Sequence, residues 1–156
     1  MNTEASDDLL YHYQQKASME IEGLSHLTFI VRDLQRAARF FCEGLGAREV
    51  YDSKSRNFSL SREKFFLLND VWIACMEGQP SDARTYQHVA FKIAEADFPH
   101  FELRLRAIGV EIKPPRARVK GEGLSLYFYD YDDHLFELHT GTPGQRLDRY
   151  KVADSA

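Results

Sequence analysis

The amino-acid sequence predicts an α+β fold in which paired βαβββ modules form one curved, eight-stranded mixed sheet with helices covering one face. Two observations lead to this expectation. First, residues 25–47 and 87–110 follow the same order: a histidine, an alternating strand, an acid, an amphipathic helix and a glycine. Second, three short strand-like runs follow each helix. Because one βαβββ unit is too small to bury its own sheet, we expect the two copies to share a core.

Length and composition narrow the class of protein. The 156 residues suit one globular domain, and 44% hydrophobic residues exclude a disordered tail. A net charge of -4, with acids and bases mixed, predicts no nucleic-acid partner and no polybasic membrane anchor. No apolar run approaches the roughly 20 residues of a spanning helix, and the N-terminus lacks a signal-peptide layout. Cys42 and Cys75 lie in apparent core segments, so we expect reduced thiols in a cytoplasmic protein.

The chain is expected to divide into one domain and two short ends. The domain covers residues 21–150, with module 1 at about 21–78 and module 2 at about 85–142. Residues 1–20 are polar and lack clean periodicity, so they are expected to be an N-terminal extension, mobile or loosely helical. Residues 151–156 are expected to form a C-terminal tail.

The first module starts with the alternating run at residues 24–34. Asp33 is placed to cap the following helix, and Gly46 falls where that helix ends, since glycine tolerates positive φ. The apolar positions of the helix are Leu34, Ala37, Ala38, Phe41 and Leu45. The strand-like runs after it are residues 48–52, 64–68 and 71–77. The turn pair Asn69-Asp70 joins the last two runs and indicates a hairpin.

The second module repeats this order. Its first strand-like run covers residues 86–93, and Gly109 marks the end of its helix. Its later runs are residues 110–115, 124–130 and 134–140. A polar turn around Asp132 and Asp133 joins the last two, so this module is also expected to contain four strands.

The phase of each run predicts which side chains lie opposite the helices, because strand residues alternate between the two faces of a sheet. In the first strand the apolar residues Leu27, Phe29 and Val31 are expected to pack under a helix. His26 and Thr28 then lie on the concave face. The same reasoning places these residues there: His88, Ala90, Ser125, Tyr127, Tyr129, Glu137 and His139.

Two histidines and one glutamate on this face form a candidate metal site. His26 and His88 occupy equivalent places in the two repeats, so pseudo-symmetry is expected to bring both near the centre of the sheet. Glu137, on the last strand, can complete the set, whereas Ala74 fills the matching place in the first repeat. Two imidazoles, one carboxylate and open positions suit Mn²⁺, Fe²⁺, Ni²⁺ or Zn²⁺. A single strand histidine is more often structural, but the repeated placement favours the metal.

Two other histidines bear on this assignment. His139 is the main rival for a ligand place, because it follows Glu137 closely and shares its face. His134 falls in the polar turn and is expected to belong to that turn.

Glu63 is a second acid with two possible roles. It lies just ahead of a strand and shares a phase with Phe65 and Leu67. On a concave, aromatic surface it would be partly desolvated, as a general base requires. Alternatively, it is a solvated strand-end acid paired with Arg62 or Lys64. The residues alone leave both roles open.

Cationic residues gather in one loop and after the last strand. The loop is punctuated by proline and glycine and carries Lys113, Arg116, Arg118 and Lys120. Arg146 follows the final strand. Such cations suit a small anionic substrate, because arginine makes forked contacts with phosphoryl or carboxyl oxygens. The alternative is an ordinary charged surface loop.

The motifs resemble a known group. The double βαβββ pattern with its two histidines and late glutamate resembles the vicinal oxygen chelate, or glyoxalase/bleomycin-resistance, superfamily. Within it, the segments IEGLSHLTFIVRDL, FSLSREKFFL, HVAFKI, PPRARVKGEG and YFYDYDDHLFELHTG are similar to fosfomycin-resistance hydrolases of the FosX type. The resemblance runs from about Ile21 to Arg149.

The resemblance implies a manganese-dependent epoxide hydrolase that confers fosfomycin resistance by adding water to the oxirane. His26, His88 and Glu137 match the family's metal ligands, and Glu63 matches its general base. Other divalent metals remain possible. Sheets of this kind usually pair across a two-fold axis, so a homodimer is expected.

The resemblance also implies a phosphonate pocket. Positions that line it in related proteins are Thr28, Trp72, Arg116, Ser125, Tyr127 and Arg146. Arg116 is preferred over Arg118, its neighbour in the loop. The related thiol transferases bind potassium before the serine-tyrosine strand, but a lysine stands in that loop here, so no potassium site is expected.

Three alternatives stay open. A thiol transferase would add glutathione or another small thiol to the same epoxide, although Glu63 favours water. A glyoxalase, epimerase or ring-cleaving dioxygenase would use similar ligands but leave Glu63 and the cationic loop unexplained. A non-catalytic antibiotic-binding protein of this fold would usually lack the ligands.

Overall fold

The structure is a computed structural model, and it describes residues 21–115, 121 and 123–153. The expected extension at 1–20 and the cationic residues Arg116, Arg118 and Lys120 lie outside this part of the chain. The described elements are β1 (His26–Val31), α2 (Leu34–Ala38), η1 (Arg39–Gly44), β2 (Arg48–Asp52), β3 (Glu63–Leu68), β4 (Val71–Glu77), β5 (His88–Lys92), η2 (Glu95–Asp97), α3 (Phe98–Ala107), β6 (Ser125–Tyr129), β7 (Leu135–His139) and α4 (Pro143–Ala153).

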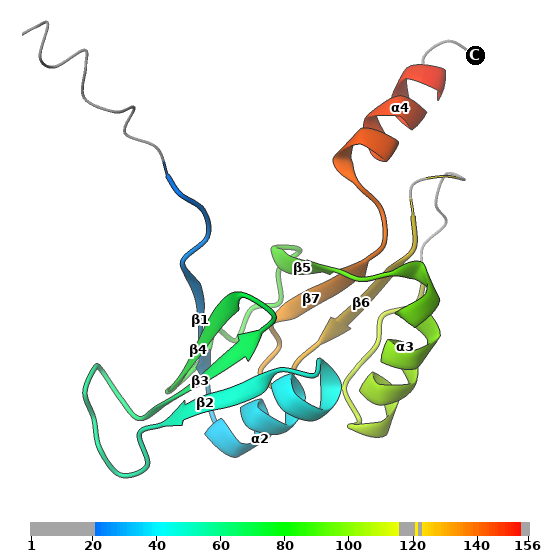
Figure 1. Ribbon diagram of the computed structural model, residues 1–156. Helices are drawn as coiled ribbons and strands as arrows, with labels where there is room; N and C mark the ends of the chain where they lie inside the picture. The colour runs from blue at the N-terminus through cyan, green and yellow to red at the C-terminus, as the bar shows by residue number, and fades with distance from the viewer. Residues whose placement is uncertain (1–20, 116–120, 122, 154–156) are drawn as a thin grey trace, which may run out of the picture.

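The strands form two separate sheets (Figure 1). Sheet 1 has the order β1-β4-β3-β2, with β1 parallel to β4 and the other pairs antiparallel. Sheet 2 has the order β5-β7-β6, with β5 parallel to β7 and β6 antiparallel to it. Each of the two mixed sheets comes from one of the two expected modules.

The expectation of one eight-stranded sheet is wrong for the described chain, which has seven strands in two sheets. The missing strand is the run at residues 110–115, where Ile112 makes only an isolated bridge to Phe128. Pro114 and Pro115 follow directly, and proline has no N–H group to extend a ladder. The run therefore touches sheet 2 without becoming a regular strand.

The first helix begins and ends as the sequence predicts. Asp33 Oδ1 accepts hydrogen bonds from the N–H groups of Gln35 and Arg36 at 2.7 and 3.1 Å. Gly46 has φ +79°, in the left-handed region that favours glycine. In between, α2 widens into the π-helical segment η1, so its last turns differ from the regular helix expected. At Gly44 an added Cβ would lie 2.7 Å from Ile108, so this glycine permits the close approach of Ile108.

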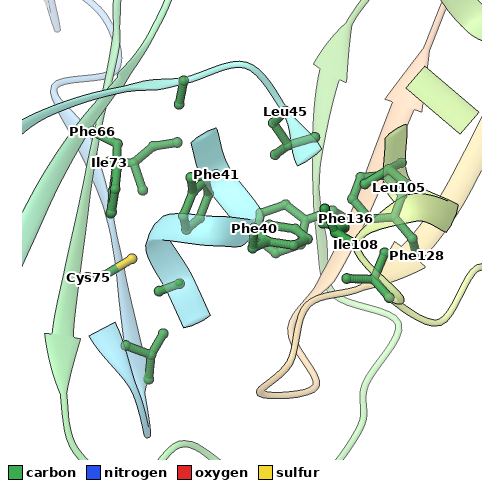
Figure 2. Packing of buried hydrophobic residues seen from close by; sticks show 14 of the residues in the cluster. Phe40, Phe41, Leu45, Phe66, Ile73, Cys75, Leu105, Ile108, Phe128 and Phe136 are labelled. Atoms are coloured by element: carbon green, nitrogen blue, oxygen red, sulfur yellow. The ribbon is translucent and has the colours of Figure 1, made fainter. Parts of the chain in front are cut away.

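One hydrophobic core joins both modules. Phe41 points toward Phe66 and Ile73 of sheet 1, whereas Phe40 lies next to Phe136 of sheet 2 (Figure 2). The ring centroids are 5.3 Å apart for Phe41 and Phe66, and 5.1 Å apart for Phe40 and Phe136. Full burial of a phenylalanine contributes about 1.5–3 kcal/mol, so adjacent residues of one helical segment bind the two sheets together. Cys75 is buried in this core, and both cysteines are free thiols.

The sequence pattern did not predict the last helix, α4. α4 starts at Pro143 and continues past residue 150, so the expected tail begins inside a helix. Gln145 N–H donates to Thr142 Oγ1 at 3.2 Å, and Thr142 N–H donates to Gln145 Oε1 at 2.9 Å. This reciprocal pair is a capping box, and the sequence TPGQ carries its signature. Figure 1 shows α4 standing away from the two sheets. Among the described residues, no helix has the length and apolar character needed to cross a bilayer.

Candidate functional site

His88 and Glu137 meet on the open face of sheet 2. β5 and β7 are parallel, and Ala90 is paired with Glu137. His88 lies two residues before Ala90, so its side chain is on the same face as that of Glu137. His88 Nε2 lies 3.0 Å from Glu137 Oε2. On the other side of the ring, Nδ1 lies 2.8 Å from the carbonyl oxygen of Tyr86. A carbonyl only accepts, so Nδ1 carries a proton and, in a neutral ring, the Nε2 lone pair faces the carboxylate.

This arrangement fits a cation. A lone pair and a carboxylate repel each other unless a proton or a metal ion lies between them. Imidazole nitrogen and carboxylate oxygen are the donors that Mn²⁺ and similar ions accept. A backbone carbonyl on the opposite ring nitrogen, as Tyr86 supplies here, is the outer partner typical of metal-binding histidines. The chemistry of the pair therefore matches the predicted role of both residues.

Glu137 is held as an anion by its neighbours. The side chain is 5% exposed. Burial alone would raise its pKa, but hydrogen bonds from Ser125 and Tyr127 and the nearby His139 and His88 outweigh it, so the pKa of Glu137 is lowered. An ionised carboxylate at neutral pH is the form that binds a metal.

Tyr127 and His139 complete this face. Burial, the hydrogen bond with Tyr86 and the charge of Glu137 raise the pKa of Tyr127 to about 12, so its phenol stays protonated. His139 Nδ1 lies 2.8 Å from Ser125 Oγ and 3.6 Å from Glu137 Oε1. His139 thus keeps its place as the rival ligand.

A hollow of about 340 Å³ lies over these residues. Its lining includes His88, Glu137, His139 and, from α4, Arg146. The helix that the sequence did not predict is therefore the element that carries the predicted Arg146 to the site. A second hollow, of about 230 Å³, contains Ser125 and Tyr127 together with Lys113. Arg116 and Arg118 lie outside the described residues.

The remaining predicted residues lie on sheet 1. His26 is registered with Trp72 and Thr28 with Ala74, so all four share the open face. The His26 and Trp72 rings have centroids 4.5 Å apart. Trp72 Nε1 is buried and has no hydrogen-bond partner among the described residues, so it is a donor available to a ligand. His26 itself is exposed.

Glu63 lies on the same face of sheet 1 and is buried. Glu63 is paired with Met76 on β4, and Phe65, two residues later on β3, is paired with Ala74. Because alternate strand residues share a face, Glu63 lies on the same face as Ala74. Its relative exposure is 8%. Within the described chain its carboxylate forms no ion pair, because the two neighbouring cations bind other acids. Arg62 pairs with Glu77, and Lys64 pairs with Glu49 and Asp52. The alternative of a solvated acid paired with these cations is therefore wrong.

The structure does not gather the full ligand set in one chain. In the described ranges, no three histidine, cysteine or acidic side chains are close enough to hold a metal ion. His88 and Glu137 are together on sheet 2, and His26 is on sheet 1. His134 binds Asp130 Oδ2 through Nδ1 at 2.7 Å, which confirms its place in the turn.

Two contributors were missed from the sequence. Tyr86 orients His88 through its carbonyl group and contacts Tyr127 through its hydroxyl. Any residue type can make a contact through its backbone carbonyl group, so residue identity could not predict the contact of Tyr86 with His88. The one available signal was the position of Tyr86 two residues before His88. Ser53 contacts the backbone of Glu63, and its fully buried hydroxyl has no signature in the local sequence.

Comparison with known proteins gives consistent matches. Residues 23–138 match the Glyoxalase/Bleomycin resistance protein/Dioxygenase superfamily. The chain is 57% identical over 129 residues to the fosfomycin resistance protein FosX of Mesorhizobium japonicum, covering 83% of this chain and 93% of the relative. It is 36% identical over 138 residues to the metallothiol transferase FosB of Bacillus licheniformis, covering 85% and 84% of the two chains.

A solved structure agrees with these matches. A mutant of FosX from Listeria monocytogenes, complexed with Mn(II) and 1S,2S-dihydroxypropylphosphonic acid, superimposes with a TM-score of 0.76 at 50% identity. The match covers 84% of this chain and 99% of that structure.

Proposed function

We propose that this chain, which belongs to the glyoxalase/bleomycin resistance protein/dioxygenase superfamily and within it to the FosX fosfomycin resistance proteins, opens the oxirane of fosfomycin by adding water. The observation that carries the proposal is the 57% identity to FosX over 93% of that relative's length. A FosX structure with Mn(II) and a dihydroxypropylphosphonic acid supports it, because that diol is what water addition to fosfomycin produces.

Mn²⁺ is the proposed cofactor, and His26, His88 and Glu137 are the proposed ligands. The lone pair of His88 Nε2 facing the ionised Glu137 supports a cation at this point. When bound, the metal would supply Lewis-acid stabilisation for the negative charge that develops on the oxirane oxygen. The donor set itself admits other divalent ions, and the Mn(II) in the FosX structure favours manganese.

We propose that a homodimer brings the ligands together. β1, which carries His26, and β5, which carries His88, are both edge strands of their sheets. Edge strands present unpaired backbone groups that favour pairing with another chain. Placing sheet 1 of one copy beside sheet 2 of the other would unite His26 with His88 and Glu137 and form an extended, curved sheet. Two such sites follow from two-fold symmetry.

Glu63 is the proposed general base. Its carboxylate takes a proton from a water molecule, whose oxygen forms a bond to an oxirane carbon. The bond between that carbon and the ring oxygen breaks, the ring oxygen takes a proton from solvent, and Glu63 returns its proton to solvent, so the product is a vicinal diol. Two features support this role. Glu63 is buried, and among the described residues no ion pair occupies its carboxylate. Positioned proton transfer of this kind contributes roughly 10²- to 10⁴-fold to the rate.

The phosphonate is proposed to bind among polar residues of both sheets and α4. Arg146 lines the same hollow as His88 and Glu137, and its guanidinium group can donate two hydrogen bonds to a phosphonate. The buried Trp72 Nε1, which has no partner among the described residues, is an available donor, and Tyr127 is a further proposed contact. The remaining proposed contacts are Thr28, Ser125 and Arg116. Holding the substrate in one orientation lowers the entropic part of the barrier.

A thiol transferase is the second candidate, because FosB is 36% identical to the chain. The test is ³¹P NMR of fosfomycin incubated with the purified protein and Mn²⁺, with and without a small thiol. Water addition predicts the diol phosphonate signal in the absence of thiol. A product that appears only with thiol would show that the chain is a transferase, and an unchanged fosfomycin signal in both samples would indicate a non-catalytic binder.

The proposed location is the cytoplasm. Cys42 and Cys75 are free, and burial raises the pKa of both thiols. Reduced thiols are typical of a reducing compartment.

A further inference from the structure

Ser53 and Glu63 face each other where the β2–β3 hairpin opens into its loop. Ser53 N–H donates to the carbonyl oxygen of Glu63 at 3.0 Å. In return, Glu63 N–H donates to the hydroxyl oxygen of Ser53 at 2.9 Å. Ser53 is fully buried, with 0% relative exposure, although it begins a loop of exposed residues. A two-point contact therefore fixes the backbone of Glu63.

The hydroxyl of Ser53 takes the place of a missing backbone acceptor. Asp52 is registered with Lys64, so Ser53 and Glu63 are the next antiparallel pair. In a regular pair of this type, Glu63 N–H would bind the carbonyl oxygen of Ser53. That carbonyl instead accepts from Arg56 N–H at 3.0 Å, because the chain turns at Lys54, which has φ +55°. Without the hydroxyl, a buried N–H group of Glu63 would lose its partner.

The residues on either side of Glu63 are anchored independently. Arg62 binds Glu77 of β4, with Nε 2.9 Å from Oε2. Lys64 is 3% exposed, and its ammonium group binds Glu49 and Asp52 at 2.8 and 2.9 Å. Because strand side chains alternate, the side chain of Lys64 points to the opposite face from that of Glu63. These ion pairs hold the strand, and among the described residues the hydrogen bonds of the Glu63 backbone are both with Ser53.

We propose that Ser53 is a positioning residue for the catalytic base: its buried hydroxyl fixes the backbone of Glu63 at the mouth of the hairpin and so sets where the carboxylate lies. The inference rests on the proposed function, in which Glu63 activates water. The described hydrogen bonds of Ser53 are with Glu63 and Arg56, so its effect is proposed to reach the reaction only through Glu63.

The test is a double-mutant cycle of Ser53→Ala and Glu63→Gln in the full chain with Mn²⁺. For Ser53→Ala alone we expect kcat for fosfomycin hydration to fall about 10- to 100-fold, because displacement of a reacting group by 1 Å costs about 10²-fold. KM and the Mn²⁺ dissociation constant are expected to stay within about twofold, since the fully buried hydroxyl binds the backbone of Glu63. In the Glu63→Gln background, Ser53→Ala is expected to change the residual rate by less than about twofold.

Ser59→Ala is the matched control, because it removes an exposed hydroxyl from the same loop and is expected to leave kcat unchanged. If Ser53→Ala does not fold, as judged by urea unfolding, Ser53→Cys replaces it. Cysteine fills similar space but accepts hydrogen bonds weakly, so a fall in kcat is again expected.

The outcomes separate this inference from the proposed function. A wild-type rate for Glu63→Gln would overturn the base assignment itself. A slow Glu63→Gln with a wild-type kcat for Ser53→Ala would overturn only the role of Ser53. Equal rate losses from Ser53→Ala in both backgrounds would also overturn it, because they would show a general structural effect.

Discussion

His88 Nε2 lies 3.0 Å from Glu137 Oε2, while the opposite nitrogen of the same ring lies 2.8 Å from the carbonyl oxygen of Tyr86. The two acceptors, one on each side, cannot both be satisfied by a single proton on the imidazole. A second proton on the ring or a metal ion next to Nε2 and the carboxylate resolves the conflict. The metal account of this protein depends on this contact more than on any other in the described chain.

Mn²⁺ is expected to stabilise the folded protein. A ligand that binds only the native state adds about 2.7 kcal/mol at a concentration 100 times its Kd, so Tm should rise with added metal. Glu137→Gln is expected to abolish most of this rise, because it removes an anionic ligand. Glu102→Gln, which changes an acid in a helical pair with Arg106, serves as the control and should keep the full rise. Differential scanning fluorimetry across a Mn²⁺ titration measures both. A full rise in Glu137→Gln would contradict the ligand assignment.

Two inactive variants are expected to restore activity when mixed. His26→Ala and His88→Ala each destroy every site of their own homodimer if the ligands come from both copies. In a mixed dimer, one of the two sites receives an intact His26 and an intact His88. Random exchange should therefore give about a quarter of the wild-type activity.

The mixing experiment also tests the single-chain alternative. The proteins are unfolded together, refolded and assayed for fosfomycin hydration, with each variant refolded alone as the control. No recovery in a mixture that forms dimers would show that each chain supplies its own complete ligand set.

The aromatic core is expected to be sensitive to truncation. Phe136 is fully buried and contacts rings from both modules, including Phe40 of the first and Phe128 of the second. Phe136→Ala should reduce the free energy of unfolding by about 3–5 kcal/mol, because it removes buried contacts and leaves a cavity. Leu60→Ala is the control: Leu60 is 91% exposed, so the change should stay within about 0.5 kcal/mol. Urea unfolding by circular dichroism measures both values.

Low pH is expected to weaken the ion pairs that Lys64 forms with Glu49 and Asp52. The hydrogen bond with Lys64 lowers the pKa of Asp52 below its ordinary value of 3.8. The folded state then binds this proton less readily than the unfolded state, so the stabilisation is complete above about pH 4 and is lost as pH falls through the folded pKa. For Lys64, burial lowers the pKa but the hydrogen bonds with Glu49 and Asp52 outweigh it. Its raised pKa gives stabilisation that is present below 10.5 and lost at higher pH.

The measurement is the urea midpoint of the wild type and of Asp52→Asn as a function of pH. The difference between the two proteins should be constant near neutral pH and shrink below about pH 4. A difference that persists unchanged at lower pH would contradict the assigned shift.

Much of the fold and of the candidate site followed from sequence periodicity. The two-residue alternation in β1 and β7 placed His26 and Glu137 on open faces, because strand geometry is local. The helix start at Asp33 was likewise a local signal. The eighth strand, predicted at residues 110–115, does not form, because Pro114 and Pro115 interrupt the run and cannot extend a ladder.

The relation between the two modules could not be derived in the same way. The repeat shows that His26 and His88 are equivalent, but their distance depends on how the sheets pair, and the two lie on separate sheets of one chain. Thr142 and Gln145 form the capping box that starts α4, a local signal that strand periodicity does not contain, so periodicity predicts Arg146 only as a residue after the last strand.

The most direct test of water addition primed by Glu63 is the initial rate of diol formation in ¹⁸O-labelled water with Mn²⁺ and no thiol, followed by mass spectrometry. Wild-type protein should form a diol phosphonate with one ¹⁸O atom, and Glu63→Gln should form it about 10²- to 10⁴-fold more slowly. Glu95→Gln, an exposed acid, should match the wild type. Diol formation by Glu63→Gln at the wild-type rate, or a product without the label, would contradict the account.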